Sequence, residues 1–363
     1  MMDAMMSNNG KTPILSAKDI EVRFRVRDNY LTAIRNVSLD LYDGETFAIV
    51  GESGSGKSVF TKTFTGMLES NGSITNGTIM FHGKDLTKLK TDRDWAGIRG
   101  AKIATIFQDP MTSLNPIKTI GSQITEVIEK HQKISKAEAK TQAIEMMHRV
   151  GITNAEERFN NYPFQYSGGM RQRIVIAIAL SCHPEILICD EPTTALDVTI
   201  QAQILKLIKD LQKELGFTTV YITHDLGVVA KVADRVGVMY GGQIIEYGTV
   251  EEIFYDPRHP YTWALLSSLP QLGVKGEDLY CITGTPPSLY NKIQGDAFAP
   301  RNPKAMLVDF EKEPPFFRVT DTHYAKTWLL DPRAPKLEKP AAIQGLHEKI
   351  EKMTAKGGVF HVE

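Results

Sequence analysis

Apolar and polar residues alternate along the first part of the chain, which predicts extended strands. The alternation runs through Leu15–Leu41 and is clearest in Ile20–Phe24 and Val37–Leu41. Thr46–Val50 is almost wholly apolar, as in a buried strand, and Gly77–Phe81 has the composition of another strand. We therefore expect this part of the chain to form sheet.

Residues 109–182 follow a helical spacing instead. Ser135, with Glu138 three residues later, has the form of a helix N-cap, and Gly151 is a typical end signal. The apolar residues between these two signals recur at helical intervals, at Ala139, Ala143, Ile144, Met147 and Val150. The pattern predicts a mostly helical insertion.

Strand and helix patterns alternate again after this insertion. Ile186–Cys189 and Thr218–Ile222 are strand-like, Ile200–Leu215 has one apolar helical face, and Val236–Met239 with Gln243–Tyr247 forms a predicted hairpin. Strands that alternate with helices are typical of a parallel sheet covered on both faces. The chain is therefore expected to have an α/β fold.

The pattern also divides the chain into a main domain and a C-terminal extension. We expect residues 1–13 to be a flexible leader and residues 14–255 to form the α/β domain, helical insertion included. Residues 256–363 are richer in proline and turn residues, which favours an appended unit.

Composition narrows the class of protein. The 363 residues include 42 Lys and Arg against 43 Asp and Glu, so the chain lacks the basic excess typical of a general nucleic-acid binder. Its three cysteines, Cys182, Cys189 and Cys281, are too few and too scattered for a disulfide framework or a thiolate metal site, which favours a reducing compartment. No apolar run approaches the roughly 18–20 residues that span a bilayer. Any membrane role is therefore expected to depend on a partner.

The strongest chemical signal is the sequence GESGSGKS at Gly51–Ser58, which matches the phosphate-binding pattern G-x-x-x-x-G-K-[ST] in full. It follows a predicted strand and opens a helix, so its N–H groups and the positive helix end can converge on phosphate oxygens. Lys57 can reach the β- and γ-phosphates, and Ser58 can ligate Mg²⁺. The residues expected to contact a nucleotide here are Gly51, Ser53, Gly54, Ser55, Gly56, Lys57, Ser58 and Val59.

Two adjacent carboxylates follow the predicted strand Ile186–Cys189. Asp190 and Glu191 would lie at its carboxyl end, where ligands bind in open α/β sheets. Alone, the pair would predict only a solvated strand end. Downstream of a phosphate loop, we expect Asp190 to hold Mg²⁺ directly or through water, and Glu191 to orient the attacking water.

A third motif, within the sequence YSGGMRQR, resembles the signature of the ABC ATPase family. That signature is usually written L-S-G-G-Q, and here Tyr166 and Met170 replace its first and last residues. The serine and both glycines are intact and open a predicted helix. In the family this element contacts the γ-phosphate held by the opposing subunit, so the resemblance implies that Ser167, Gly168 and Gly169 bind nucleotide across a dimer.

Other residues stand where an ABC ATPase requires them. The resemblance implies that Gln108 contacts Mg²⁺ or water, that Asp197 lies at the dimer interface, and that His224 bonds the γ-phosphate. The aromatic that stacks on adenine is expected near the end of the first strand. Phe24 fits this role better than Tyr30, although either could equally be a core residue.

The resemblance extends over residues 15–255 and implies a complete fold and chemistry. The fold would be a P-loop NTPase of the ABC type, α/β, with a mixed central sheet, an antiparallel β subdomain and a helical subdomain. ATP and Mg²⁺ would be the cofactors, with catalytic roles for Lys57, Gln108, Glu191 and His224. Two such subunits would close around two ATPs.

A second resemblance narrows the substrate. Pro257–Thr262 (PRHPYT) and Gly284–Pro287 are similar to the C-terminal extension of oligopeptide and dipeptide importer ATPases, and Gln108–Pro116 and Met170–Arg173 fit the same family, in particular its D-type subunit. This implies a peripheral protein on the cytoplasmic face of the membrane that powers peptide import. Its partners would be a homologous F-type ATPase, two transmembrane permease subunits and, indirectly, an extracellular peptide-binding protein. No nucleic acid is expected.

The extension departs from that family in one respect. Many such extensions carry four cysteines that can hold an iron–sulfur cluster, and Asp296, Asn302, Asp309 and Thr327 stand at those positions here. Cluster ligation depends on thiolates, so no iron–sulfur cluster is expected. The extension should instead be held by an apolar core, for which the candidates are Phe298, Phe310, Phe316, Phe317 and Trp328.

Three other functions fit part of the pattern. A soluble ABC ATPase acting on ribosomes or DNA would typically carry two cassettes or a long coiled coil, and the sequence contains neither. A P-loop enzyme such as a small-molecule kinase would not need the Ser167-Gly-Gly motif. The ATPase of an exporter is disfavoured only by the C-terminal resemblance.

Overall fold

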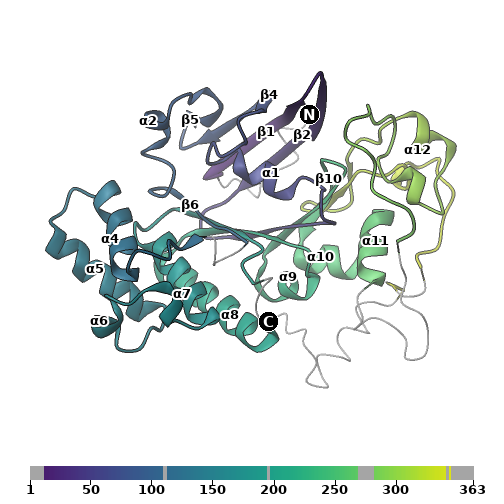
Figure 1. The fold of residues 1–363 in the computed structure, drawn as a ribbon. Helices are drawn as coiled ribbons and strands as arrows, with labels where there is room; N and C mark the ends of the chain where they lie inside the picture. The colour runs from purple at the N-terminus through teal and green to yellow at the C-terminus, as the bar shows by residue number, and fades with distance from the viewer. Residues whose placement is uncertain (1–11, 109–112, 194–196, 269–281, 341–342, 345–363) are drawn as a thin grey trace.

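The computed structural model describes residues 12–108, 113–193, 197–268, 282–340 and 343–344. Most of the predicted leader, residues 109–112 within the Gln108–Pro116 segment, and Cys281 lie outside the described residues. Figure 1 shows a central sheet with an antiparallel sheet above it and helices below it, while the extension lies at one side.

The antiparallel sheet contains the first strands of the chain. Its strands follow the order β2-β1-β4-β5, with bounds Asn29–Leu41, Leu15–Val26, Gly72–Phe81 and Lys84–Asp85. The predicted alternation is confirmed, because Ile20, Val22 and Val37 are buried between more exposed neighbours. The last predicted strand of this part begins at Gly72, five residues earlier than its apolar pattern indicates.

The central sheet is mixed, as expected. Its order is β11-β12-β10-β9-β3-β8-β7-β6. The strands from β9 to β6 run parallel, and β10, β12 and β11 pair antiparallel. In the order of the sheet, the bounds are Phe317–Arg318, Tyr324–Ala325, Gln243–Thr249, Arg235–Tyr240, Thr46–Val50, Thr218–Thr223, Ile186–Asp190 and Ile103–Ile106.

The strand β3 lies between two apolar cores. Phe47 and Ile49 belong to the core shared with the antiparallel sheet, whereas Ala48 and Val50 belong to the core under the helices. This alternation follows from the two-residue period of a strand and explains why β3 is apolar along its length.

Helices between residues 120 and 267 cover the opposite face of the sheet, and those of the predicted insertion lie among them. The predicted capping box is present, with the Ser135 hydroxyl accepting from the Glu138 N–H and the Glu138 carboxylate accepting from the Ser135 N–H. Gly151 ends that helix with a φ of 77°.

The α-helices are α1 Lys57–Lys62, α2 Asp92–Trp95, α4 Ile120–His131, α5 Lys136–Arg149, α6 Ala155–Arg158, α7 Gly168–Leu180, α8 Val198–Leu215, α9 Leu226–Val232, α10 Val250–Tyr255, α11 Pro260–Ser267 and α12 Leu307–Glu311. Single turns of 3₁₀-helix occupy Leu86–Lys88, Pro163–Gln165, Ala299–Arg301 and Trp328–Leu330.

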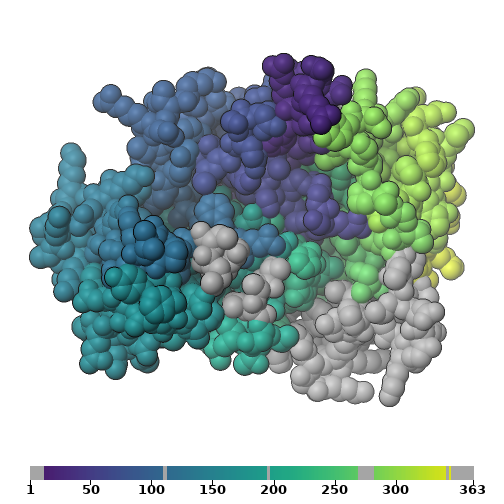
Figure 2. Space-filling model, viewed as in Figure 1, coloured from purple at the N-terminus to yellow at the C-terminus, as the bar shows by residue number. Residues whose placement is uncertain are grey.

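The extension continues the central sheet. Its strand β12 pairs antiparallel with β10, with Tyr324 opposite Tyr247 and their rings stacked at 5.2 Å. Figure 2 shows the extension (green to yellow) against the N-terminal strands (purple) along one side of the molecule. The extension therefore adds strands to the central sheet and lies beside the N-terminal strands at the surface.

The expected core of the extension is partly wrong. Phe298 is buried, but Phe310 is 48% exposed, while Phe316, Phe317 and Trp328 are half-buried. Phe310 faces outward because its neighbour Asp309 is turned inward, where its carboxylate accepts the Met306 N–H at the start of α12, and consecutive helical residues point in different directions. The four positions expected to carry cysteines in related extensions are all buried: Asp296, Asn302, Asp309 and Thr327.

Candidate active site

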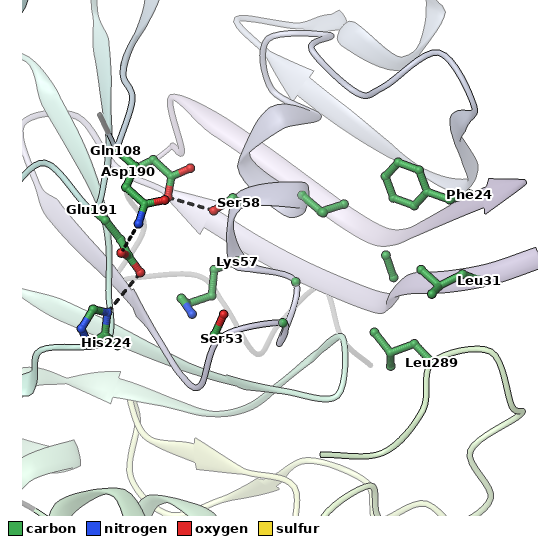
Figure 3. A pocket seen from close by; sticks show the side chains of 14 residues that line it. Phe24, Leu31, Ser53, Lys57, Ser58, Gln108, Asp190, Glu191, His224 and Leu289 are labelled. Atoms are coloured by element: carbon green, nitrogen blue, oxygen red, sulfur yellow. Dashed lines mark hydrogen bonds and ion pairs between the residues drawn. The ribbon is translucent and has the colours of Figure 1, made fainter. Parts of the chain in front are cut away.

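A cavity of about 590 Å³ gathers residues from both sheets and from the extension. One end is polar and the other apolar (Figure 3). The lining residues are Phe24, Leu31, Ala33, Ser53, Gly54, Gly56, Lys57, Ser58, Val59, Gln108, Asp190, Glu191, His224 and Leu289.

The polar end lies where four neighbouring parallel strands finish. The glycine-rich loop follows β3, His224 follows β8, Glu191 follows β7, and Gln108 follows β6. Parallel strands place their carboxyl ends at one edge of the sheet, so residues more than 100 positions apart converge there.

The loop between β3 and α1 depends on glycine at two of its positions. A Cβ on Gly51 would lie 2.1 Å from the Met239 carbonyl oxygen, which excludes any larger residue. Gly56, which precedes α1, has a φ of 102°, a region that glycine enters without strain. Both positions therefore require glycine for the loop to keep this path.

Lys57 is buried within this loop. Its ammonium group donates to the carbonyl oxygens of Gly51 and Glu52, at 2.8 and 2.9 Å. Burial lowers the pKa of Lys57, and the nearby carboxylates of Glu191 and Asp190 act in the opposite direction. The side chain is therefore a positive charge in a confined space, next to where phosphate oxygens would lie.

Ser58 and Asp190 present oxygen atoms beside Lys57. The Ser58 hydroxyl donates to Asp190 Oδ1 at 2.8 Å. Burial raises the pKa of Asp190 above its usual value, although the bond from Ser58 acts in the opposite direction. A hydroxyl and a carboxylate side by side are the hard oxygen donors that Mg²⁺ prefers, so the residues fit that ion.

Glu191 lies between Gln108 and His224. The Gln108 amide donates to Glu191 Oε2 at 3.0 Å, and His224 Nδ1 is 3.1 Å from Glu191 Oε1 (Figure 3). The backbone of Glu191 is left-handed, with a φ of 47°, and its N–H donates to the Ile222 carbonyl at 2.9 Å. This uncommon backbone turns the carboxylate into the cavity beside the two polar side chains.

The apolar end is formed by Phe24, Leu31 and Leu289 (Figure 3). Gly72 lies against the Phe24 ring, where a Cβ would approach within 2.5 Å. Tyr30 is 59% exposed and is not among the residues that line this cavity. Of the two aromatic candidates, Phe24 is therefore the one beside the cavity.

Sequence reasoning missed three lining residues. Leu31 and Ala33 lie on the predicted alternating strand, whose period could have indicated them. Leu289 belongs to the extension, and its carbonyl accepts the Thr32 N–H at 3.1 Å. No sequence signal links Leu289 to residues more than 250 positions earlier.

The remaining predicted residues lie outside this cavity's lining. Gly51 and Ser55 belong to the loop, where Ser55 is buried. Ser167 caps α7 by accepting the Met170 N–H, with Gly168 and Gly169 in its first turn, and Asp197 caps α8 by accepting the Ile200 N–H. A Cβ on Gly168 would meet nothing within 4 Å, whereas a Cβ on Gly169 would lie 2.9 Å from Ile200, so the backbone at the start of α7 is open at Gly168.

Comparisons with known proteins show which family the chain belongs to. Residues 34–194 match the ABC transporter family, and residues 245–307 match the family described as oligopeptide/dipeptide transporter, C-terminal region. The oligopeptide transport ATP-binding protein AmiE of Streptococcus pneumoniae is 69% identical over 94% of this chain and 97% of its own. The oligopeptide transport ATP-binding protein OppD of Bacillus subtilis is 56% identical over 93% and 95%.

A solved structure shares the fold. The ATP-binding cassette MJ0796, described as a dimer in a post-hydrolysis state bound to ADP and Pi, matches with a TM-score of 0.58 and 28% identity, over 65% of this chain and 98% of its own. No helix in the described ranges is both long and apolar enough to cross a membrane. The chain belongs to the ABC transporter family, as an ATP-binding subunit of the oligopeptide/dipeptide transporters.

Proposed function

We propose that this chain binds ATP with Mg²⁺ in the cavity and that hydrolysis there powers import of oligopeptides or dipeptides through transmembrane partners. The observation that carries the proposal is the division of one cavity into a polar end, with Lys57, Asp190 and Glu191, and an apolar end, with Phe24. ATP is divided in the same way, because its triphosphate is charged and the faces of its purine base are apolar.

The loop and its helix would hold the triphosphate. Lys57 would turn from the Gly51 and Glu52 carbonyls to the β- and γ-phosphates, which offer it a full opposite charge. The loop N–H groups and the start of α1 add positive potential. Ser58 and Asp190 would hold Mg²⁺, which when bound neutralises phosphate charge.

Glu191 would act on the attacking water. Its carboxylate accepts from Gln108 and lies beside His224, which supports a role in orienting water and receiving its proton. His224 is 60% exposed and follows β8 directly, so it can bond the γ-phosphate once nucleotide is present. Through its bond to Glu191, Gln108 would relay the state of the site to a transmembrane partner.

A second ATPase subunit would complete the site. Ser167, Gly168 and Gly169 lie at the start of α7, outside the lining of their own chain's cavity, and the space beside Gly168 is open, which supports action on nucleotide bound by a partner. Asp197 would lie at the same interface. We propose a related F-type ATPase as this partner, with two permease subunits and an extracellular peptide-binding protein completing the transporter at the cytoplasmic face of the membrane. No nucleic acid takes part.

Glu191→Gln in the assembled transporter tests this function. We expect the variant to bind ATP but to hydrolyse it very slowly, so that a closed ATPase pair accumulates, measured by turnover of radiolabelled ATP and retention of nucleotide. Glu185→Gln is the matched control, because Glu185 precedes the opposite end of β7 and pairs with Lys102 at the surface. Turnover near the wild-type rate in Glu191→Gln would refute the role of Glu191.

A further inference from the structure

The extension contacts the phosphate loop at Glu52. The Glu52 N–H donates to the Tyr261 hydroxyl at 2.8 Å, and its carboxylate lies 2.8 Å from Arg301 Nη1. Its carbonyl oxygen accepts from Lys57 at 2.9 Å and from the Ser55 N–H at 3.2 Å. Glu52 therefore links two residues of the extension to the lysine that would bind phosphate.

Tyr261 is fixed where it meets the loop. His259 caps α11, its Nδ1 accepting the Tyr261 N–H at 3.0 Å, and Pro260 occupies the first helical position. The Tyr261 ring packs against Tyr240 and Phe298, with centroids 4.5 and 5.3 Å away. The His-Pro-Tyr sequence thus aims a buried hydroxyl at a backbone N–H of the phosphate loop.

Arg301 is the second link, and it is almost fully buried. Besides Glu52, its guanidinium donates to the Tyr240 hydroxyl at 3.1 Å and to the Thr283 carbonyl at 3.0 Å. Burial alone would lower the pKa of Arg301, but the bonds to Glu52 and Tyr240 raise it above its usual value. A buried charge held by this many acceptors keeps one position, and it neutralises a carboxylate beside the triphosphate site.

We propose that Tyr261 and Arg301 are positioning residues for ATP binding, which act on the phosphate loop through Glu52. Tyr261 fixes the backbone of Glu52, and Arg301 neutralises its carboxylate, which would otherwise repel the triphosphate. The proposal rests on the function proposed above. A displacement of the extension would then change ATP affinity, although the extension supplies none of the groups that react.

The contacts of Tyr261 and Arg301 with Glu52 predict how far each variant changes the Kd for ATP. Tyr261→Phe removes one hydrogen bond and keeps the ring, so the Kd for ATP should rise about three- to tenfold. Arg301→Ala leaves Glu52 charged and without this partner, so the rise should be about tenfold or more. Arg301→Lys should recover part of the affinity, because it keeps the charge but loses the fork geometry. Glu52→Gln added to Arg301→Ala should also recover affinity by removing the repulsion.

The Kd for ATP is measured on the full-length chain with Mg²⁺ present, by letting ATP compete against a fluorescent ATP analogue. The kcat and KM of ATP hydrolysis are measured on the assembled transporter. We expect KM to rise while kcat at saturating ATP stays near the wild-type value. Thermal unfolding without nucleotide separates this effect from a loss of folding. Arg318→Ala is the matched control, because Arg318 lies exposed in the extension and bonds Asp321; its Kd should match the wild type.

The outcomes distinguish this inference from the function on which it rests. If Lys57→Ala loses ATP binding while Tyr261→Phe and Arg301→Ala bind ATP as the wild type does, the positioning role is wrong and the function stands. If Glu52→Gln fails to restore affinity to Arg301→Ala, the charge argument is wrong. If Lys57→Ala binds ATP normally, the proposed nucleotide site itself is wrong.

Discussion

The two ends of the cavity are built in different ways. At the phosphate end, Asp190 and Glu191 stand at the carboxyl end of β7, Lys57 begins α1 after the loop that follows β3, and each belongs to a motif readable in the sequence. At the base end, Phe24 and Leu289 supply apolar surface and come from the antiparallel sheet and the extension. Charge chemistry restricts the residue type at each position, whereas apolar surface can be supplied by many residues and by any nearby segment.

This difference also sets the size of the effects expected from mutation. Groups at the phosphate end face developing charge in a confined site, where electrostatic interactions are strong. Groups at the base end contribute by burying apolar area, which is worth less per side chain. Substitutions should therefore be severe at one end and graded at the other.

Lys57→Ala should have the largest effect. It removes the buried positive charge that balances the phosphates, so ATP hydrolysis by the assembled transporter should fall by about a hundredfold or more, and peptide uptake should stop. Lys62→Ala is the control, because Lys62 ends the same helix and pairs with Glu69 at the surface. Equal losses in both variants would show that damage to α1, rather than the charge of Lys57, is responsible.

The sequence predicted the phosphate end better than the base end, for a physical reason. Gln108, Glu191 and His224 each follow a strand of the parallel part of the sheet, whose carboxyl ends lie at one edge, and the resemblance to ABC ATPases assigned Gln108 and His224 to the site. No comparable rule of topology predicts which residues of the extension lie inside it or reach the cavity. Phe310 was expected in its core because it is aromatic, but the inward turn of Asp309 directs it outward. Leu289 lines the cavity from a segment whose backbone bonds to β2, a contact that no local pattern indicates.

Phe24→Ala should have an intermediate effect. Stacking of a base on an aromatic ring is worth about 1–3 kcal/mol, so the Kd for ATP should rise about tenfold while kcat at saturation changes little. Tyr30→Ala is the control, because Tyr30 is exposed and does not line the cavity. Competition with a fluorescent ATP analogue measures both. A larger loss in Tyr30→Ala would reverse the assignment of the stacking residue.

Leu289→Ala should have the smallest effect, and it tests whether the base end truly includes the extension. The substitution removes apolar surface but keeps the backbone bond to Thr32, so the Kd for ATP should rise only about two- to fivefold. Tyr290→Ala serves as the control, since Tyr290 is 52% exposed and does not line this cavity. Because Leu289 would contact the base and not the phosphates, its loss should weaken ATP more than inorganic triphosphate. Equal weakening of both ligands would mean that Leu289 acts through the loop and that the base end belongs to the antiparallel sheet alone.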